Sequence, residues 1–327
     1  VRNRLDFISG KDSLGFNAKD ITMLAQYTQS AFRALARVTS RGMITKTRRA
    51  CGGARRSASS QQAGESGPVL EELAARCLCI SSYFTVPDQG ITTPELLSRA
   101  SGFLVRRSPP AGQRDATGRQ GRVHIVASGH VIHPFRYPNY YPRETHEWLH
   151  CLRERNVETR VEVRAPRTGA LLLSHTLAAE TFHHRTRDIA VLHAGSDDAL
   201  LAALREWSRH HVAELAPSAR PGARVGFVGH RLLEHGDEEQ VQVPDEVAGE
   251  ALGATPMQAF FRTERTLVMG MCGGPVYDAD GRCVGATEGI VPDTGPKALA
   301  GCAAVIGSEI LGAFLDEIEA GLAPDKR

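Results

Sequence analysis

The chain has 327 residues, of which 42% are hydrophobic, and its 39 Lys and Arg nearly balance its 37 Asp and Glu, giving a formal net charge of +2. This length allows two domains with an ample core. A charge near zero argues against nucleic acid as a general partner, and the absence of any run of about 18 apolar residues argues against a membrane span.

The charge is unevenly placed at the N-terminus. Residues 24–64 contain no Asp or Glu, yet they contain eight Lys or Arg. An acid-poor segment rich in Arg and Ser is typical of an organellar transit peptide, and residues 32–38 can form a short amphipathic helix. We therefore predict a disordered targeting segment over residues 1–70 and a location in the mitochondrial matrix, with Met23 as a plausible start. A basic arm that binds RNA or an acidic surface is the alternative.

Two apolar strands follow the targeting segment. The first is Ser101-Gly102-Phe103-Leu104-Val105, and the second runs over residues 121–132, where small residues precede His130. The Pro-, Gly- and Arg-rich residues 106–122 predict an exposed hairpin loop between them.

A possible zinc motif comes next. His146, Glu147 and His150 form an HExxH sequence within a predicted helix over residues 143–155. On a helix, two histidines four residues apart face the same way and can share a zinc ion, with the glutamate as base. However, no Gly-x-x-His supplies a third ligand, since Asn156 stands there. The alternative is a surface helix whose apolar residues pack on the core: Trp148, Leu149 and Leu152.

The middle of the chain combines an acidic turn, a helix and a strand. Asp188 precedes the apolar run Ile189-Ala190-Val191-Leu192. Leucines at helical spacing predict a linking helix over residues 198–218, ended near Pro217. A strand over residues 223–230 follows it.

The glycine-rich sequence Gly270-Met271-Cys272-Gly273-Gly274-Pro275 predicts a tight turn around a cysteine. Glycines permit unusual dihedral angles, so the N–H groups of Gly270 and Cys272 can point at one spot, as an oxyanion site requires. Asp278-Ala279-Asp280-Gly281 then predicts a hairpin. The last predicted element is an amphipathic helix over residues 308–322.

These segments together resemble trypsin-like proteases, especially those of the HtrA type. The cysteine turn resembles their Gly-x-Ser-Gly-Gly-Pro loop with Cys in place of Ser, and the segments with His130 and Asp188 resemble those of the other triad members, in chymotrypsin order. The resemblance implies an all-β fold of two six-stranded antiparallel barrels with added helices and a C-terminal helix. The first barrel would span 71–197, the linking helix 198–218, and the second barrel with the final helix 219–327.

The resemblance also implies acyl transfer on a peptide or protein substrate, without a cofactor. Asp188 would orient His130, His130 would take the proton of Cys272, and Gly270 and Cys272 would form the oxyanion hole. A thiol beside a histidinium ionises readily, so we expect a reactive thiolate. Seven scattered cysteines without a Cys-x-x-Cys pair fit a reducing compartment.

The resemblance places the substrate pocket at Thr266 and at Thr287-Glu288-Gly289. Thr266 is not an acid, so cleavage after Arg or Lys is not expected, and a small apolar or polar side chain fits better. Two other functions stay open: a catalytically inactive, protease-fold structural subunit of a larger mitochondrial assembly, and an HExxH zinc peptidase. Replacement of serine by the larger cysteine motivates the inactive alternative.

Overall fold

The structure is a computed structural model. It describes residue 72 and residues 75–106, 123–141, 147–177, 180–193, 200, 202, 212–232 and 241–322. The chain divides into two units, residues 1–53 with 87–90 and residues 54–86 with 91–327. In the first unit, the described part is a 3-10 turn, η1 (Pro87–Gln89), in which Gly90 N–H donates to the Pro87 carbonyl at 3.0 Å. Every strand that the structure describes belongs to the second unit.

Two predicted segments lie outside the described residues. The targeting segment over 1–70 is one, so it and the mitochondrial location stay predictions. The loop over 106–122 is the other, apart from Arg106, which ends a strand. Within the described part of the chain, no helix is long and apolar enough to cross a membrane.

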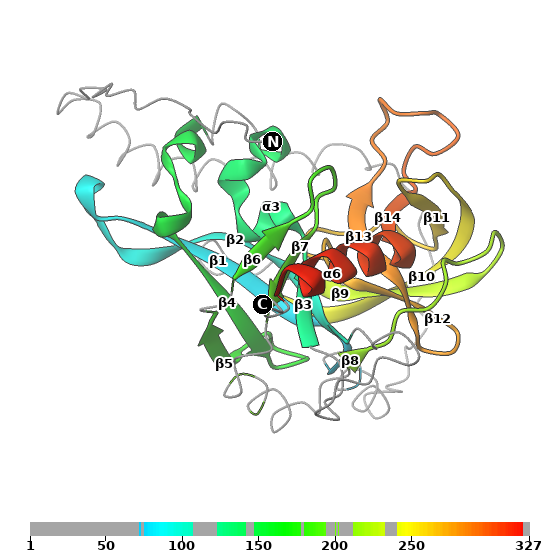
Figure 1. Ribbon diagram of the computed structural model, residues 1–327, viewed down its shortest axis with the longest axis horizontal. Coiled ribbons are helices and arrows are strands. Elements are labelled where there is room, and N and C mark those ends of the chain that lie inside the picture. The colour runs from blue at the N-terminus through cyan, green and yellow to red at the C-terminus, as the bar shows by residue number, and fades with distance from the viewer. Residues whose placement is uncertain are drawn as a thin grey trace, which may run out of the picture. The chain divides into compact units, whose positions relative to one another are not determined.

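The first half of the chain forms an eight-stranded sheet in the order β5-β4-β1-β2-β3-β7-β6, with β8 pairing with β2 in parallel (Figure 1). The strands are β1 (Leu78–Val86), β2 (Ile91–Arg106), β3 (Val123–Ala127), β4 (Val157–Arg164), β5 (Leu171–Thr176), β6 (Thr181–His183), β7 (Ala190–His193) and β8 (Val212–Ala213). The apolar strand β3 is buried at every position, whereas β5 at the edge of the sheet is partly to fully exposed. The strand with the continuous apolar run is the central one, because a central strand is covered on both faces.

The second half forms a closed barrel in the order β10-β11-β14-β13-β12-β9. The strands are β9 (Arg224–Leu232), β10 (Gln242–Ala254), β11 (Ala259–Thr263), β12 (Pro275–Asp278), β13 (Cys283–Ile290) and β14 (Ala303–Gly307). The predicted hairpin at 278–281 joins β12 to β13, and Asp278 N–H donates to the Arg282 carbonyl at 2.9 Å. The last element, α6 (Ser308–Leu322), packs on β13 and β14.

The predicted all-β fold with a C-terminal helix is confirmed, and its second barrel has the six strands predicted. The first half differs in detail, because its strand ladder does not close on itself within the described residues and includes an eighth, parallel strand. Whether the domains divide at residues 198–218 stays a prediction.

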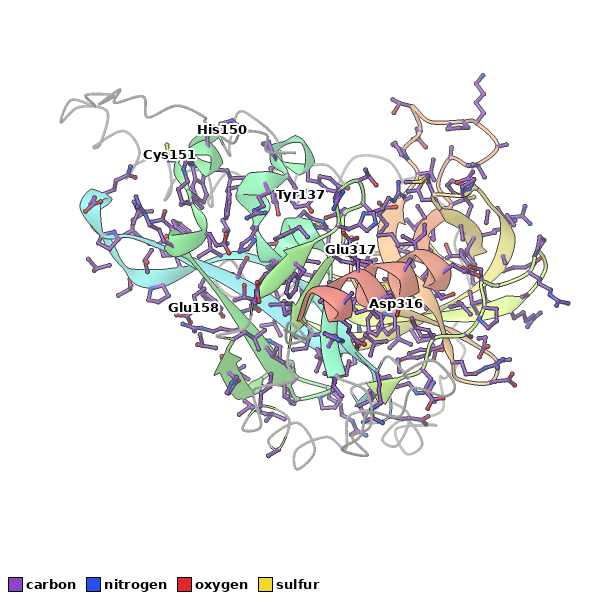
Figure 2. The ribbon with its side chains drawn as sticks, in the orientation of Figure 1. Tyr137, His150, Cys151, Glu158, Asp316 and Glu317 are labelled. Carbon is purple, nitrogen blue, oxygen red and sulfur yellow. The ribbon has the colours of Figure 1, made fainter. Side chains whose placement is uncertain are left out.

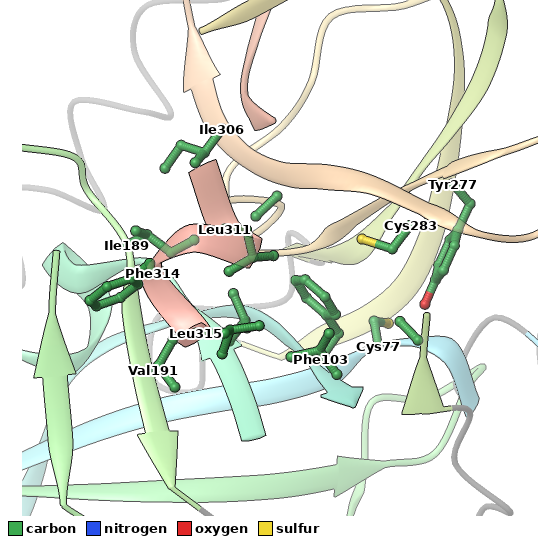
Figure 3. Close-up of a cluster of buried hydrophobic side chains, with 14 of the residues drawn as sticks. Cys77, Phe103, Ile189, Val191, Tyr277, Cys283, Ile306, Leu311, Phe314 and Leu315 are labelled. Carbon is green, nitrogen blue, oxygen red and sulfur yellow. The ribbon is translucent and has the colours of Figure 1, made fainter. Parts of the chain in front are cut away.

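One buried cluster joins the two halves (Figure 3). Phe103 and Val191 enter it from the first sheet, and Tyr277 and Cys283 enter it from the barrel. Helix α6 adds one apolar face, as predicted: Leu311, Phe314, Leu315 and Ile318 are buried and Ile310 is partly buried. Burial of such side chains is worth about 1.5–3 kcal/mol each, so this shared core fixes the two halves against each other.

The helix predicted over residues 143–155 is not found in its described part. In place of a helix over 143–155, the described residues form two 3-10 turns, η4 (Glu147–Cys151) and η5 (Glu154–Asn156). Arg153 between them is extended, and its N–H donates to the Asn156 side chain, which stops helix propagation. Leu149 and Leu152 still pack on Phe84, as predicted.

The predicted linking helix over 198–218 does not reach its predicted end. Leu200 and Ala202 are helical, residues 203–211 lie outside the described residues, and Val212–Ala213 form β8. Pairing with Leu104 and Val105 of β2 satisfies the backbone there and buries Ala213, which a helix at this place would not do.

Candidate active site

The cysteine loop Gly270–Pro275 leads into β12 and packs against the first sheet. Gly270 (φ 98°) and Gly273 (φ 79°) adopt the left-handed conformation that favours glycine. A Cβ on Gly273 would overlap the backbone of Ser101 in β2 and of Ser128 just after β3. Glycine at position 273 therefore allows the residue beside Cys272 to lie directly on the first sheet.

Hydrogen bonds orient carbonyl groups of this loop and of Met269, which precedes it. Leu232 N–H donates to the Met269 carbonyl at 3.4 Å, and Ser101 N–H donates to the Cys272 carbonyl at 3.1 Å. The Ser101 hydroxyl also donates to the Gly270 carbonyl at 2.6 Å. The N–H groups of Gly270 and Cys272, in contrast, donate to no oxygen of any described residue. These two N–H groups are available for an oxyanion beside the thiol.

His130 lies on the single helical turn α3 (Gly129–Ile132), which starts where β3 ends. The predicted strand over 121–132 is therefore shorter than predicted, because Val131 and Ile132 N–H both donate to the Ser128 carbonyl and close a turn. Ala127 of β3 pairs with Ala190 of β7. That register brings the residues just beyond the two strands, His130 and Asp188, together.

Asp188 holds His130 at two points. One carboxylate oxygen accepts the His130 backbone N–H at 2.8 Å, and the other lies 2.5 Å from Nδ1 of the imidazole. The Asp188 side chain is 3% exposed and that of His130 is 14% exposed. With Nδ1 bound to the carboxylate, Nε2 is the ring nitrogen left to exchange a proton.

Cys272 is half-buried, and its sulfur makes no hydrogen bond to His130 or to any other described side chain. Burial, and then the charges of Asp188 and Glu288, raise the pKa of its thiol to about 12, although its own N–H partly opposes this shift. The thiol is therefore protonated at neutral pH. Burial and the two carboxylates therefore oppose formation of the expected thiolate, and the reactivity of Cys272 stays a prediction.

The structure brings part of the predicted pocket to the loop. Thr287 N–H donates to the Gly274 carbonyl and its own carbonyl accepts Gly273 N–H, both at 2.8 Å. Thr287 is 2% exposed, and its hydroxyl has no hydrogen-bond partner among the described residues. Glu288 and Gly289 follow it in β13 and are half-buried.

The role predicted for Thr266 in the pocket stays a prediction. Thr266 is exposed on the segment between β11 and Gly270, and it shares no hydrogen bond with the other described pocket residues. A cavity of about 440 Å³ lies elsewhere, with Tyr83, His133 and Asn156 among its lining residues, and none of the predicted site residues lines it.

Sequence reasoning missed two side chains that hold Glu288. Arg187 pairs with the Glu288 carboxylate at 2.6 Å, and Gln258 Nε2 donates to the same oxygen. Arg187 could have been noticed because it precedes Asp188, but Gln258 lies in the turn between β10 and β11 and carries no local signal. The role of Ser101 was also missed, since a serine in an apolar strand looks like any other buried polar residue.

The HExxH residues do not form the helix that a zinc site requires. His146 lies outside the described residues, and η4 is a 3-10 turn, in which residues four apart do not share a face. His150 and its neighbour Cys151 are exposed (Figure 2). The described residues hold no group of three His, Cys, Asp or Glu that could bind a metal ion.

Comparison with known families agrees with this geometry. The family model described as "Trypsin-like peptidase domain" matches residues 100–285, which include His130, Asp188 and Cys272. The chain belongs to the trypsin-like peptidase family. The matched range of this trypsin-like chain includes the cysteine loop and the pair of His130 and Asp188.

Two solved structures are similar to the trypsin-like chain. One is the Rv3671c protease in an inactive form, at 14% identity and a TM-score of 0.41, covering 80% of this chain and 98% of that one. The other is Rv3671c from M. tuberculosis H37Rv, a serine-to-alanine mutant in an inactive form, at 14% identity and a TM-score of 0.40, covering 80% and 96%. No curated protein matches the chain. Because these identities and TM-scores are low, the family assignment depends only on the match to the family model.

Proposed function

We propose that the chain is an endopeptidase in which Cys272 is the nucleophile, His130 the base and Asp188 its orienting group. The observation that carries this proposal is the double contact of Asp188 with His130, next to a loop in which the N–H groups of Gly270 and Cys272 donate to no oxygen of any described residue. A carboxylate bound to both the backbone and Nδ1 fixes the tautomer of the imidazole, and a pure scaffold has no need of that arrangement.

The raised pKa of Cys272 favours general-base catalysis over a preformed ion pair. His130 Nε2 takes the thiol proton as the sulfur attacks the peptide carbonyl, and the N–H groups of Gly270 and Cys272 stabilise the oxyanion. Collapse breaks the C–N bond, and the leaving amine takes the proton from His130. A water then attacks the thioester, gives its proton to His130 and releases the acid, while the sulfur regains a proton.

The pocket wall supports substrates without a basic side chain at the cleaved position. Its acidic residue, Glu288, is already neutralised by Arg187 and bonded by Gln258. An acid engaged in this way is a poor partner for a substrate Arg or Lys. A small apolar or polar side chain remains the better fit.

The second candidate is an inactive, protease-fold structural subunit that uses the fold as a binding surface. Two observations favour it: the protonated state of Cys272 and the lack of a hydrogen bond between its sulfur and His130 in the described residues. The two candidates make opposite predictions about the reactivity of the thiol.

The test is alkylation of the full chain by iodoacetamide across pH 6–9, read by mass spectrometry for each cysteine. Exposed Cys151 and half-buried Cys302 serve as controls within the same protein. Because the pKa of Cys272 is about 12, we expect its rate to rise across the whole range without a plateau. If His130 acts as the base, His130→Ala lowers the alkylation rate of Cys272 and leaves the rates of Cys151 and Cys302 unchanged.

The same proteins are then incubated with a peptide library, and cleavage is measured. Loss of cleavage in Cys272→Ala, with slower cleavage in His130→Ala, supports the endopeptidase. Two results together would overturn this proposal and leave the structural subunit. The unmodified chain would cleave no peptide, and the alkylation rate of Cys272 would be the same with and without His130→Ala.

A further inference from the structure

Three tyrosines contact the short turn that carries His130. They come from the segment Tyr137–Tyr141, which follows α3 and folds back on it. The Tyr140 ring stacks on the His130 imidazole, with centroids 4.8 Å apart and planes 13° from parallel. The Tyr141 hydroxyl donates to the His130 carbonyl at 2.9 Å. A Cβ on Gly129 would overlap the hydroxyl and ring of Tyr137.

Two proline-initiated turns fix the path of this segment. They are η2 (Pro134–Arg136) and η3 (Pro138–Tyr140), each with proline at its first turn, where its fixed φ suits the geometry. Tyr137 N–H donates to the Pro134 carbonyl at 2.9 Å, and Tyr141 N–H donates to the Pro138 carbonyl at 3.3 Å. The two prolines therefore restrict the backbone that places the tyrosine rings.

From these contacts we infer that Tyr137, Tyr140 and Tyr141 form a positioning clamp on His130. This role in catalysis rests on the proposed function. The clamp acts through His130 and not on substrate: Tyr141 fixes the backbone, Tyr137 packs on Gly129, and Tyr140 fixes the plane of the imidazole. Together with the two contacts from Asp188, the clamp holds the imidazole ring in one orientation.

Tyr140 also suits the charged intermediate. When His130 takes a proton it becomes a cation, and the face of a tyrosine ring attracts a cation that lies over it. Burial, and then the charges of Asp188 and Glu288, raise the pKa of the Tyr140 hydroxyl, so it stays neutral at working pH and adds no charge to this balance. The ring is 53% exposed, so it covers one side of the imidazole without sealing the site.

The experiment compares Tyr140→Leu, Tyr140→Phe and Tyr141→Phe in the full chain with the control Leu172→Ala. Leu172 is an exposed leucine on β5, 43% accessible, at the edge of the sheet. Three readouts are taken: kcat and KM separately, the melting temperature, and the far-downfield proton resonance given by the short Nδ1–Oδ2 hydrogen bond of His130 with Asp188.

We expect Tyr140→Leu to lower kcat about fivefold with little change in KM and to broaden the downfield resonance. Tyr140→Phe, which keeps the ring but loses the hydrogen bond of the hydroxyl with Asp188, should recover most of both losses. Tyr141→Phe, which removes one hydrogen bond, should lower kcat by a similar factor of about five. A Tyr140→Leu variant that matches Leu172→Ala in kcat and resonance would overturn the clamp. A change in KM alone would also overturn it and make Tyr140 a wall of the substrate pocket.

The resonance separates this inference from the proposed function. If the unmodified chain cleaves no peptide, the endopeptidase fails, yet the resonance of His130 still reports whether the tyrosines hold the ring. A sharp resonance that survives Tyr140→Leu and Tyr141→Phe refutes the clamp whatever the activity.

Discussion

The two halves of the molecule hold their proposed catalytic groups in different ways. The barrel closes on itself and presents Cys272 on a glycine turn, over a core of apolar side chains such as Phe227 and Phe261. The first sheet does not close within the described residues. It presents His130 on the turn α3 and Asp188 just before β7, and its strands carry a buried charge network.

That network centres on Glu162, whose side chain is fully buried. Arg164 binds it at 2.6 Å, Tyr83 donates to it at 2.7 Å, and Arg99 lies 3.3 Å away. Burial by itself raises the pKa of Glu162, but the two guanidinium groups and the Tyr83 hydrogen bond outweigh it and hold the pKa below its ordinary value. The stability of the first sheet, which holds the proposed base, therefore depends on buried ionised groups. The stability of the barrel, which holds the proposed nucleophile, depends on apolar packing.

The largest effect should come from the first half. Asp188→Asn removes the charge that fixes the His130 tautomer and stabilises the imidazolium, so kcat should fall on the order of 10⁴-fold. Asp316→Asn, an exposed site on α6, is the matched control. Steady-state kinetics on a cleaved peptide, with the melting temperature of each variant, provide the check. A loss of less than tenfold would mean that Asp188 does not orient a working base.

Glu162→Gln should lower the free energy of unfolding by about 3 kcal/mol at pH 7, because it leaves two buried guanidinium groups without a counter-charge. The pKa of Glu162 is lowered on folding, so the unfolded chain binds the proton more tightly. Its contribution is therefore complete above the ordinary pKa of about 4.3 and is lost as the pH falls through the lower folded value.

Urea unfolding at pH 7 and below pH 4 measures both effects. Phe261→Leu in the barrel is the control, and it should cost about 1 kcal/mol at either pH. If the cost of Glu162→Gln proved as independent of pH as that of Phe261→Leu, the contrast between the halves would be wrong.

The smallest of the three effects lies where the halves meet. Ser101 of β2 donates to the Gly270 carbonyl and accepts the His230 N–H at 2.7 Å. Ser101→Ala leaves both backbone groups without that partner, so it should cost about 2 kcal/mol of stability and lower kcat about tenfold by loosening an oxyanion donor. Ser82→Ala, a buried serine of β1 with only a 3.5 Å hydrogen bond, is the control. Equal kcat in the two variants would show that the loop keeps its shape without Ser101.

Local sequence was informative wherever chemistry and backbone geometry need particular residues. Gly273 is required because a Cβ would meet the first sheet, and the hairpin at 278–281 and the apolar face of α6 follow short-range patterns. The same reasoning overextended the helices at 143–155 and 198–218. There, hydrophobic spacing fits a helix, but tertiary contacts select 3-10 turns and a parallel strand.

The sequence by itself determined the fold class, the order of His130, Asp188 and Cys272, and the glycines that shape the cysteine loop. Only the tertiary structure decided the electrostatics around the sulfur, because Asp188 comes from the turn before β7 and Glu288 from β13, and both raise its pKa. It alone also decided that Ser101 and three tyrosines support the site. The physical reason is that a turn depends on neighbours in sequence, whereas the charge and support felt by a side chain depend on neighbours in space.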